Sequence, residues 1–177
     1  MTGGADPRAL ARADFVARFG HVFEHSPWIP EAAFDAGLPG DADTAEGLHR
    51  ALCAVLRAAP DARKRALIEA HPDLAGRLAR AGTLTADSTK EQAGAGLDRL
   101  SDQEYERFTA LNAAYKETFG MPFIMAVKGR GKDEILAAFQ ARLDNDPETE
   151  FETALAQIER IALLRLKDIL PSGNLGR

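Results

Sequence analysis

The stretch His71–Gln92, HPDLAGRLARAGTLTADSTKEQ, decides how this sequence is organised. It places a histidine beside Pro72 at one end and the pair Glu91 and Gln92 at the other, with an apolar helical pattern that stops at Gly82 in between. A helix, a turn and a second helix would fold the two polar ends back toward each other. A histidine, a carboxylate and an amide carried on rigid elements are the parts of a small acid/base site.

Proline and capping signals set the helix boundaries expected within this stretch. Pro72 disfavours helix in the residue before it, which predicts that His71 lies at a helix boundary. Pro72 also suits the first turn of a new helix, which is expected to run through Leu78 and to end at Gly82. The run Ser88–Glu91 predicts a capping box that opens the next helix.

The composition predicts an all-α fold. The chain has 177 residues, of which 45% are hydrophobic and 28% charged, as in ordinary soluble globular proteins. Alanine and leucine dominate while valine, isoleucine and threonine are sparse, so helices should carry the fold. The start and stop signals predict a single-domain bundle of about eight helices over residues 1–177, with residues 1–12 and 171–177 as flexible ends.

Signals elsewhere in the chain complete this expectation. Asp14 can cap a helix whose apolar positions continue to Phe23, and Thr44 can cap a later one. The motif that begins at Ser101 predicts a further capping box. The apolar run Pro122–Val127 has no helical alternation, and one strand would have no sheet to join, so we expect a buried extended segment there.

Charge and cysteine content exclude several classes of partner. The net charge of −5 leaves no basic surface for nucleic acid or anionic membranes, and no apolar run is long enough to cross a bilayer. Neither a secretory signal nor a peroxisomal address is recognisable at the ends, so a cytoplasmic protein is expected. The single Cys53 cannot form an internal disulfide, and its place on an apolar helix face predicts a small buried side chain rather than a nucleophile.

The run His21–His25, HVFEH, matches the inverted zincin signature H-x-x-E-H. On a helix, His21 and His25 would share one face as zinc ligands, and Glu24 could act as a base. No third ligand is apparent, and Pro27 breaks the helix directly after the motif. A zinc hydrolase is therefore the alternative function, and a non-catalytic helical binding module is a second one.

Three side chains each allow a structural and a functional interpretation. His71 could simply cap the carbonyls of a helix end, and Glu91 could be the ordinary glutamate of a capping box. Arg165 lies four residues after Ile161 within the apolar stripe of the last helix. An arginine turned inward is costly unless it pairs with an internal carboxylate or an anionic ligand. The alternative is that its head group reaches solvent at the edge of the bundle.

Four segments together resemble a known enzyme family. They are FGHVFEHSPWI (19–29), EAHPDLAGRLARAGTLTADSTKEQAGAGLDRL (69–100), FTALNAAYKETFGMPFIMAVKGR (108–130) and RIALLRL (160–166). This combination resembles 2-oxo-4-hydroxy-4-carboxy-5-ureidoimidazoline (OHCU) decarboxylase, an enzyme of urate breakdown. The resemblance covers the chain from about Phe15 to Leu170.

The resemblance implies an all-α, dimeric decarboxylase that needs no metal or other cofactor and that makes (S)-allantoin from the small molecule OHCU. It assigns His71 as the catalytic histidine and Glu91 as its partner carboxylate. No transthyretin-like hydroxyisourate hydrolase extension with its terminal YRGS is recognisable in the sequence, so only the decarboxylation step is expected. The resemblance assigns to substrate binding Pro72, Ser88, Thr89, Lys90, Gln92, Phe123, Ile124, Met125, Ala126, Val127 and Arg165.

The expected chemistry needs little beyond acid/base groups. The substrate carboxylate lies on a carbon beside a ring C=N bond, so the electron pair left by CO2 has a sink within the molecule. His71, oriented by Glu91, would be the general acid/base that sets the stereochemistry. Arg165 would offset the negative charge of the substrate, while Gln92 and the backbone of residues 123–127 would bind its amides.

Overall fold

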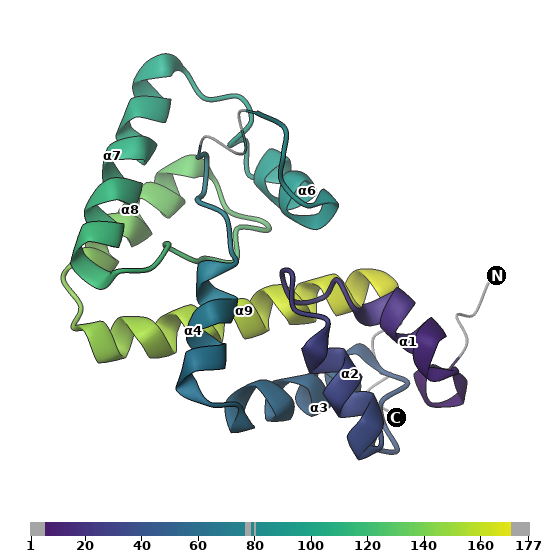
Figure 1. The fold of residues 1–177 in the computed structure, drawn as a ribbon. Coiled ribbons are helices and arrows are strands. Elements are labelled where there is room, and N and C mark those ends of the chain that lie inside the picture. Colours follow the sequence, from purple (N-terminus) through teal and green to yellow (C-terminus); the bar gives the residue numbers. More distant parts are fainter. Residues whose placement is uncertain (1–5, 77–78, 80, 171–177) are drawn as a thin grey trace, which may run out of the picture. The chain divides into compact units, whose positions relative to one another are not determined.

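A computed structural model describes residues 6–76, 79 and 81–170, and these residues form helices and loops without any strand (Figure 1). The predicted all-α class is confirmed, and the eight α-helices among these described residues agree with the expected number. In chain order the described elements are the 3-10 helix η1 (Pro7–Ala9) and the α-helices α1 (Arg12–Phe19), α2 (Trp28–Ala36), α3 (Ala45–Ala58), α4 (Asp61–Glu69), α6 (Ala86–Gly94), α7 (Asp102–Phe119), α8 (Lys132–Leu143) and α9 (Pro147–Ile169).

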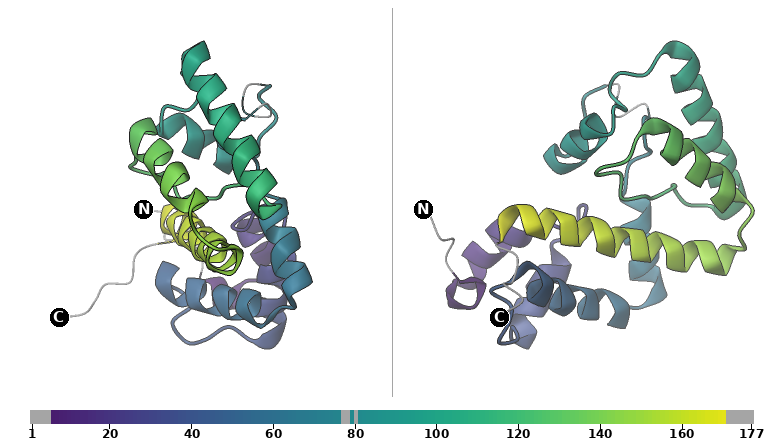
Figure 2. Two further views of the ribbon diagram at one scale, coloured as in Figure 1. Left: turned by 90° about the vertical axis from the view of Figure 1, so that its left-hand side faces the viewer. Right: turned by 180° about the vertical axis from the view of Figure 1, so that it is seen from behind.

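The chain forms two compact units. The first unit takes the chain up to Leu67 together with the part from Glu159 onward, and the second is Ile68–Ile158. The two boundaries fall inside α4 and α9. In the first unit α2 packs against both α1 and α3, and in the second α7 packs against α8 (Figure 2).

Two predicted capping residues, Thr44 and Ser101, start their helices, whereas Asp14 lies inside α1, which begins at Arg12. The Thr44 side chain accepts a hydrogen bond from the Gly47 N–H at the start of α3. Ser101 and Glu104 form the complete capping box of α7, with the Glu104 N–H to Ser101 Oγ distance at 3.1 Å. Helix α7 ends at Gly120, whose φ of 67° is the left-handed conformation that glycine adopts without strain.

Each unit has its own apolar core. Phe15 and Phe19 of α1 are fully buried in the first unit, and so are Leu48, Leu52 and Leu56, which share one face of α3. In the second unit Phe123 stacks on Phe139 with ring centroids 3.7 Å apart, and Tyr115 meets Phe123 edge-on at 5.3 Å. Aromatic pairs of this kind add roughly 1 kcal/mol each beyond the area they bury.

The expected extent of the first helix was wrong. Helix α1 ends at Phe19 rather than continuing to Phe23, and residues 20–25 form turns. Gly20 has poor helix propensity, and the apolar side chains of Val22 and Phe23 are buried without helical geometry. The segment Trp28–Pro30 forms the first turn of α2, where a proline loses no hydrogen bond.

The ends of the chain were expected to be flexible. Residues 1–5 and 171–177 lie outside the described residues, while η1 and the first residue of α1 occupy most of the range 6–12. Within the described part of the chain, no helix is both long enough and apolar enough to cross a bilayer.

Candidate active site

The motif HPDLAG begins at the end of α4, where His71 lies as predicted. Its backbone N–H donates to the Ile68 carbonyl at 3.1 Å, and its side chain is half-buried. The expectation of a new helix from Pro72 was wrong for residues 72–76, which form an extended stretch and a turn. Leu78, which was predicted to lie within that helix, is outside the described residues.

Side chains of α6 and α7 explain why residues 72–76 do not become helical. Gln92 accepts from the Ala75 N–H at 2.9 Å and donates to the Asp73 carbonyl at 3.3 Å. Asn112 donates to the Leu74 carbonyl at 2.9 Å. These bonds satisfy the backbone groups of the loop from outside, so the loop needs no helix to bury them.

Two small residues allow this loop to turn. Ala75 adopts a φ of 52°, a conformation that L-residues rarely take, and its methyl group is almost fully buried. A Cβ atom at Gly76 would lie 2.7 Å from the Cβ of Asp73, so only glycine fits there. Lys116 holds Asp73 through an ion pair of 2.7 Å.

Helix α6 begins one turn earlier than the sequence predicted. Thr85 rather than Ser88 is the N-cap, because the Thr85 hydroxyl accepts from the Ser88 N–H at 3.3 Å. Glu91 therefore does not occupy the capping-box position that would have explained it structurally. It is half-buried in the second half of α6, next to the buried Gln92.

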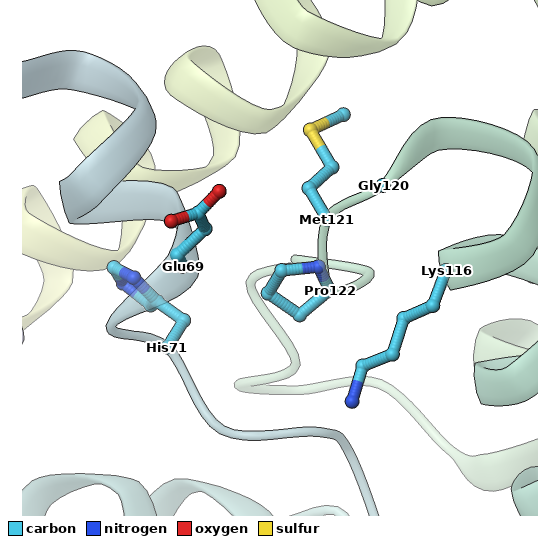
Figure 3. A pocket seen from close by; sticks show the side chains of 6 residues that line it. All are labelled: Glu69, His71, Lys116, Gly120, Met121 and Pro122. Atoms are coloured by element: carbon cyan, nitrogen blue, oxygen red, sulfur yellow. The ribbon is translucent and has the colours of Figure 1, made fainter. Parts of the chain in front are cut away.

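A cavity of about 290 Å³ lies beside His71 in the second unit (Figure 3). Glu69 and His71 at the end of α4 form one wall, and Lys116 of α7 lies across from them. Met121 and Pro122 supply an apolar surface between these polar groups. An imidazole, a carboxylate and an ammonium group around one small hollow can bind an anion and move a proton.

The segment that follows Pro122 is buried and extended, as predicted. Residues 123–127 are each at most 7% exposed. The Ala126 N–H donates to Gln157 of α9 at 2.9 Å, and the Ile124 carbonyl accepts from Arg142 at 2.6 Å. Side chains of α8 and α9 thus fix the backbone of this segment.

A buried polar cluster lies under the same segment. The fully buried Glu150 accepts from Arg142 at 2.8 Å, from Asn145 at 2.9 Å and from the Tyr115 hydroxyl. Burial alone would raise the pKa of Glu150, but these hydrogen bonds outweigh it and lower the pKa below its ordinary value. Arg142 also lies over the Phe123 ring, 4.3 Å from its centroid. The cluster therefore couples an ionised carboxylate to the conformation of residues 123 and 124.

In the first unit, Arg165 is turned inward as its position in the apolar stripe predicted. It is 5% exposed and pairs with Glu24, itself 2% exposed, at an Nη2–Oε2 distance of 3.0 Å. The sequence predicted either an internal carboxylate or an anionic ligand as the partner of Arg165, and the structure shows the carboxylate of Glu24. The snorkelling interpretation of Arg165 was wrong.

The interpretation of HVFEH as a zinc site was wrong, because it requires a helix at these residues. The motif lies in turns after α1, so His21 and His25 do not share a helix face. Both histidines are exposed while Glu24 is buried against Arg165. Among the described residues, no group of three histidine, cysteine or acidic side chains could hold a metal ion.

The remaining predicted residues divide by exposure. Pro72 is half-buried directly after His71, and Ser88 is buried in α6. Thr89 and Lys90 of α6 are exposed. Neither Glu91 nor Ser88 lines the cavity beside His71, so their predicted contacts with a substrate stay predictions.

Cys53 is less buried than predicted, but its thiol has the chemistry expected of a structural cysteine. It is half-buried in α3, and burial raises the pKa of its thiol to about 12, with the charge of Glu159 acting in the same direction. A thiol of this kind is protonated at neutral pH and is a poor nucleophile.

Sequence reasoning missed the side chains that support the site. Asn112, Arg142 and Gln157 were not singled out, although each binds the backbone of a predicted site segment. An asparagine within the apolar stripe of α7 was the available signal, because a buried amide needs partners. Lys116 was also missed, since a lysine on a helix surface is ordinarily solvated.

The fold and the loop geometry define a class, an all-α protein that presents a histidine at a helix end beside a small polar cavity. Comparison with known proteins gives the family. The sequence profile described as OHCU decarboxylase matches residues 8–167, so the chain belongs to the OHCU decarboxylase family, a family of carboxy-lyases of urate degradation.

Individual relatives agree with this assignment. The 2-oxo-4-hydroxy-4-carboxy-5-ureidoimidazoline decarboxylase of Haloferax volcanii is 42% identical over 154 residues, which cover 87% of this chain and 88% of that protein. The uric acid degradation bifunctional protein PucL of Bacillus subtilis is 44% identical over 151 residues, 85% of this chain but 29% of that protein. The crystal structure of (S)-allantoin synthase matches with a TM-score of 0.74 and 32% identity, over 93% of this chain and 53% of that one.

Proposed function

We propose that this protein decarboxylates OHCU to (S)-allantoin, with His71 as the general acid/base. Family membership supports the reaction, and the observation that carries the role of His71 is its place at the end of α4 beside a polar cavity. The loop behind it is fixed by side chains of two other helices. A general acid/base on a rigid backbone can transfer a proton to one defined face of its substrate.

The proton balance of the reaction suits a single imidazole. Loss of CO2 leaves an electron pair that moves into the ring and displaces the C=N pair onto its nitrogen, which takes up a proton from solvent. The hydroxyl on the same carbon then loses its proton to become a carbonyl, and the neighbouring ureido-bearing carbon gains one. One imidazole can accept the hydroxyl proton and deliver a proton to the ureido-bearing carbon. Delivery from one side of the ring gives one enantiomer.

The other residues have supporting roles in this proposal. Glu91 orients the imidazole, an assignment that rests on the family resemblance and on the absence of a capping role in α6. Arg165 offsets substrate charge, which rests on the resemblance alone. Gln92 holds the loop after His71 through both ends of its amide, so its second N–H is the group that remains for a substrate amide.

The site is tested by assaying His71→Ala and Glu91→Ala for (S)-allantoin formation from freshly generated OHCU. We expect the rate above the spontaneous background to fall by about 10²–10⁴-fold for His71→Ala. Glu106→Ala, which removes an exposed carboxylate of α7, serves as the matched control for Glu91→Ala. Wild-type rates in both site variants would mean that these residues do not carry the reaction.

We also propose a cytoplasmic homodimer, as the resemblance implies. The single half-buried thiol, which cannot form an internal disulfide, is compatible with a reducing compartment. Sedimentation equilibrium would give twice the chain mass of 19.1 kDa for a dimer, and a single-chain mass at micromolar concentration would exclude it.

A further inference from the structure

The turn at residues 20–26 encloses one guanidinium group. Glu24 projects from this turn onto Arg165 of α9, with a 3.0 Å contact between Oε2 and Nη2. The carbonyl oxygens of His21 and Val22, in the same turn, both lie 3.4 Å from Nη1 of Arg165. One short segment thus offers a carboxylate and two carbonyls to a single side chain.

The turn itself is braced so that Glu24 stays buried. The Ser26 hydroxyl donates to the Glu24 carbonyl at 2.9 Å, and Ser26 is 4% exposed. His25 takes a left-handed φ of 47°, which lets the chain reverse while its side chain remains exposed. The side chain of Glu24 is therefore directed inward by local backbone geometry.

Stability alone does not account for such a pair. Desolvation of two charges offsets most of their attraction, and apolar pairs of similar size often serve equally well in a core. The pair does control two properties of Arg165. It fixes the plane of the guanidinium, and it cancels the net charge that an isolated arginine would present.

We propose that Glu24 is a positioning residue for the decarboxylation. It orients Arg165 and neutralises it, so that Arg165 meets the substrate through directed hydrogen bonds rather than as a free cation. This inference rests on the proposed function, because it assumes that Arg165 contacts the substrate.

The test compares the affinity of the Glu24→Gln variant for an anionic ligand with its affinity for a neutral one. The variant keeps the side-chain size and one acceptor but leaves Arg165 with its full charge. We expect kcat to fall at least about tenfold because the guanidinium is no longer aligned. We also expect KM for the anionic substrate OHCU to fall relative to the inhibition constant of neutral (S)-allantoin, because the free charge favours the anion.

Glu46→Gln is the matched control. Glu46 of α3 pairs at 3.1 Å with Lys167, which lies on α9 as Arg165 does, but both side chains of this pair are about 40% exposed. Breaking this solvated pair should leave kcat, KM and the allantoin inhibition constant unchanged. A purely structural role for Glu24 would change KM and the inhibition constant by the same factor, or would lower stability without changing kcat, and either result overturns the proposal.

A second variant covers the case in which Glu24→Gln does not fold. The double variant Glu24→Gln with Arg165→Met removes both charges, a replacement that cores commonly tolerate. We expect it to fold with a cooperative thermal transition and to lose activity. Full activity in the double variant would overturn the inference, whereas failure of the wild-type protein to form (S)-allantoin would instead refute the proposed function.

Discussion

His71 acquires its position from its neighbours in the sequence. Pro72 ends α4, and the four residues after it form a loop rather than a helix. Two residues of that loop have clear physical tasks, since Asp73 binds Lys116 and Gly76 leaves space for the Cβ of Asp73. The motif is thus a device that holds one imidazole at the edge of a cavity.

Gly76→Ala tests this account at a single residue. The added methyl group would lie 2.7 Å from the Asp73 Cβ, so we expect the free energy of unfolding to fall by about 1–3 kcal/mol. Gly94→Ala is the control, because a Cβ there meets nothing within 4 Å. At the end of α6 it should raise stability by up to about 1 kcal/mol. Urea denaturation measures both, and equal effects would contradict the close approach.

Helix α6 acts as a support for the loop as well as a carrier of Glu91. Gln92 satisfies the buried N–H of Ala75 and the carbonyl of Asp73. A support of this kind keeps the histidine still during proton transfer, and it explains why an amide rather than an apolar side chain faces the loop.

Gln92→Ala should therefore destabilise the protein. It leaves the Ala75 N–H buried without its acceptor, which costs about 1–3 kcal/mol. Gln103→Ala makes the same chemical change at an exposed position in the first turn of α7 and should shift stability by less than about 0.5 kcal/mol. If thermal or urea unfolding showed no difference in stability between the two variants, the supporting role of the Gln92 hydrogen bonds would be contradicted.

Helices α8 and α9 support the other predicted binding segment through Arg142 and Glu150. We expect Glu150→Gln to cost roughly 3 kcal/mol at pH 7, because Arg142 would lose its buried partner. The pKa of Glu150 is lowered on folding, so its contribution is fully present above the ordinary value of 4.5. The contribution is lost as the pH falls through the lowered value.

The measurement for Glu150 is urea denaturation of the wild type and Glu150→Gln from pH 7 down to about pH 3. The difference in unfolding free energy should be constant above pH 4.5 and should shrink below it. Glu148→Gln, an exposed change in the first turn of α9, provides the control. A difference that grew on acidification would have the wrong sign for a lowered pKa.

Helical periodicity and capping signals were sufficient for most of the fold. The caps at Thr44 and Ser101, the end of α4 and the extended segment after Pro122 all follow from local chemistry. The loop at residues 72–76 could not be predicted this way, because its backbone partners come from α6 and α7, far away in the sequence. The cap at Thr85 was missed because Ser88 is an equally good capping residue type.

The candidate site was predictable in its residue types and less so in its arrangement. The inward arginine was expected to need a carboxylate, and Glu24 is that carboxylate. Glu24 had been interpreted as a zincin base because helical spacing was assumed for a segment that forms turns. Gln92 was expected to bind substrate, and the structure adds a structural task that spacing alone could not reveal.

At the scale of the whole molecule, metal chemistry separates the proposed enzyme from the zinc alternative. Since HVFEH is not helical, chelation should not affect catalysis. We expect (S)-allantoin formation to be unchanged after dialysis against EDTA, and zinc by elemental analysis to be far below one equivalent per chain. Loss of activity on chelation with recovery on adding zinc would refute the decarboxylase mechanism described above.

The most direct test of the central claim follows the circular dichroism of (S)-allantoin as OHCU is generated in the presence of the protein. The account predicts a rapid rise of the (S) signal with the wild type and with His25→Asn, which removes an exposed imidazole outside the site. It predicts only the slow, racemic background with His71→Ala. Equal rates and equal enantiomeric excess for the wild type and His71→Ala would contradict it.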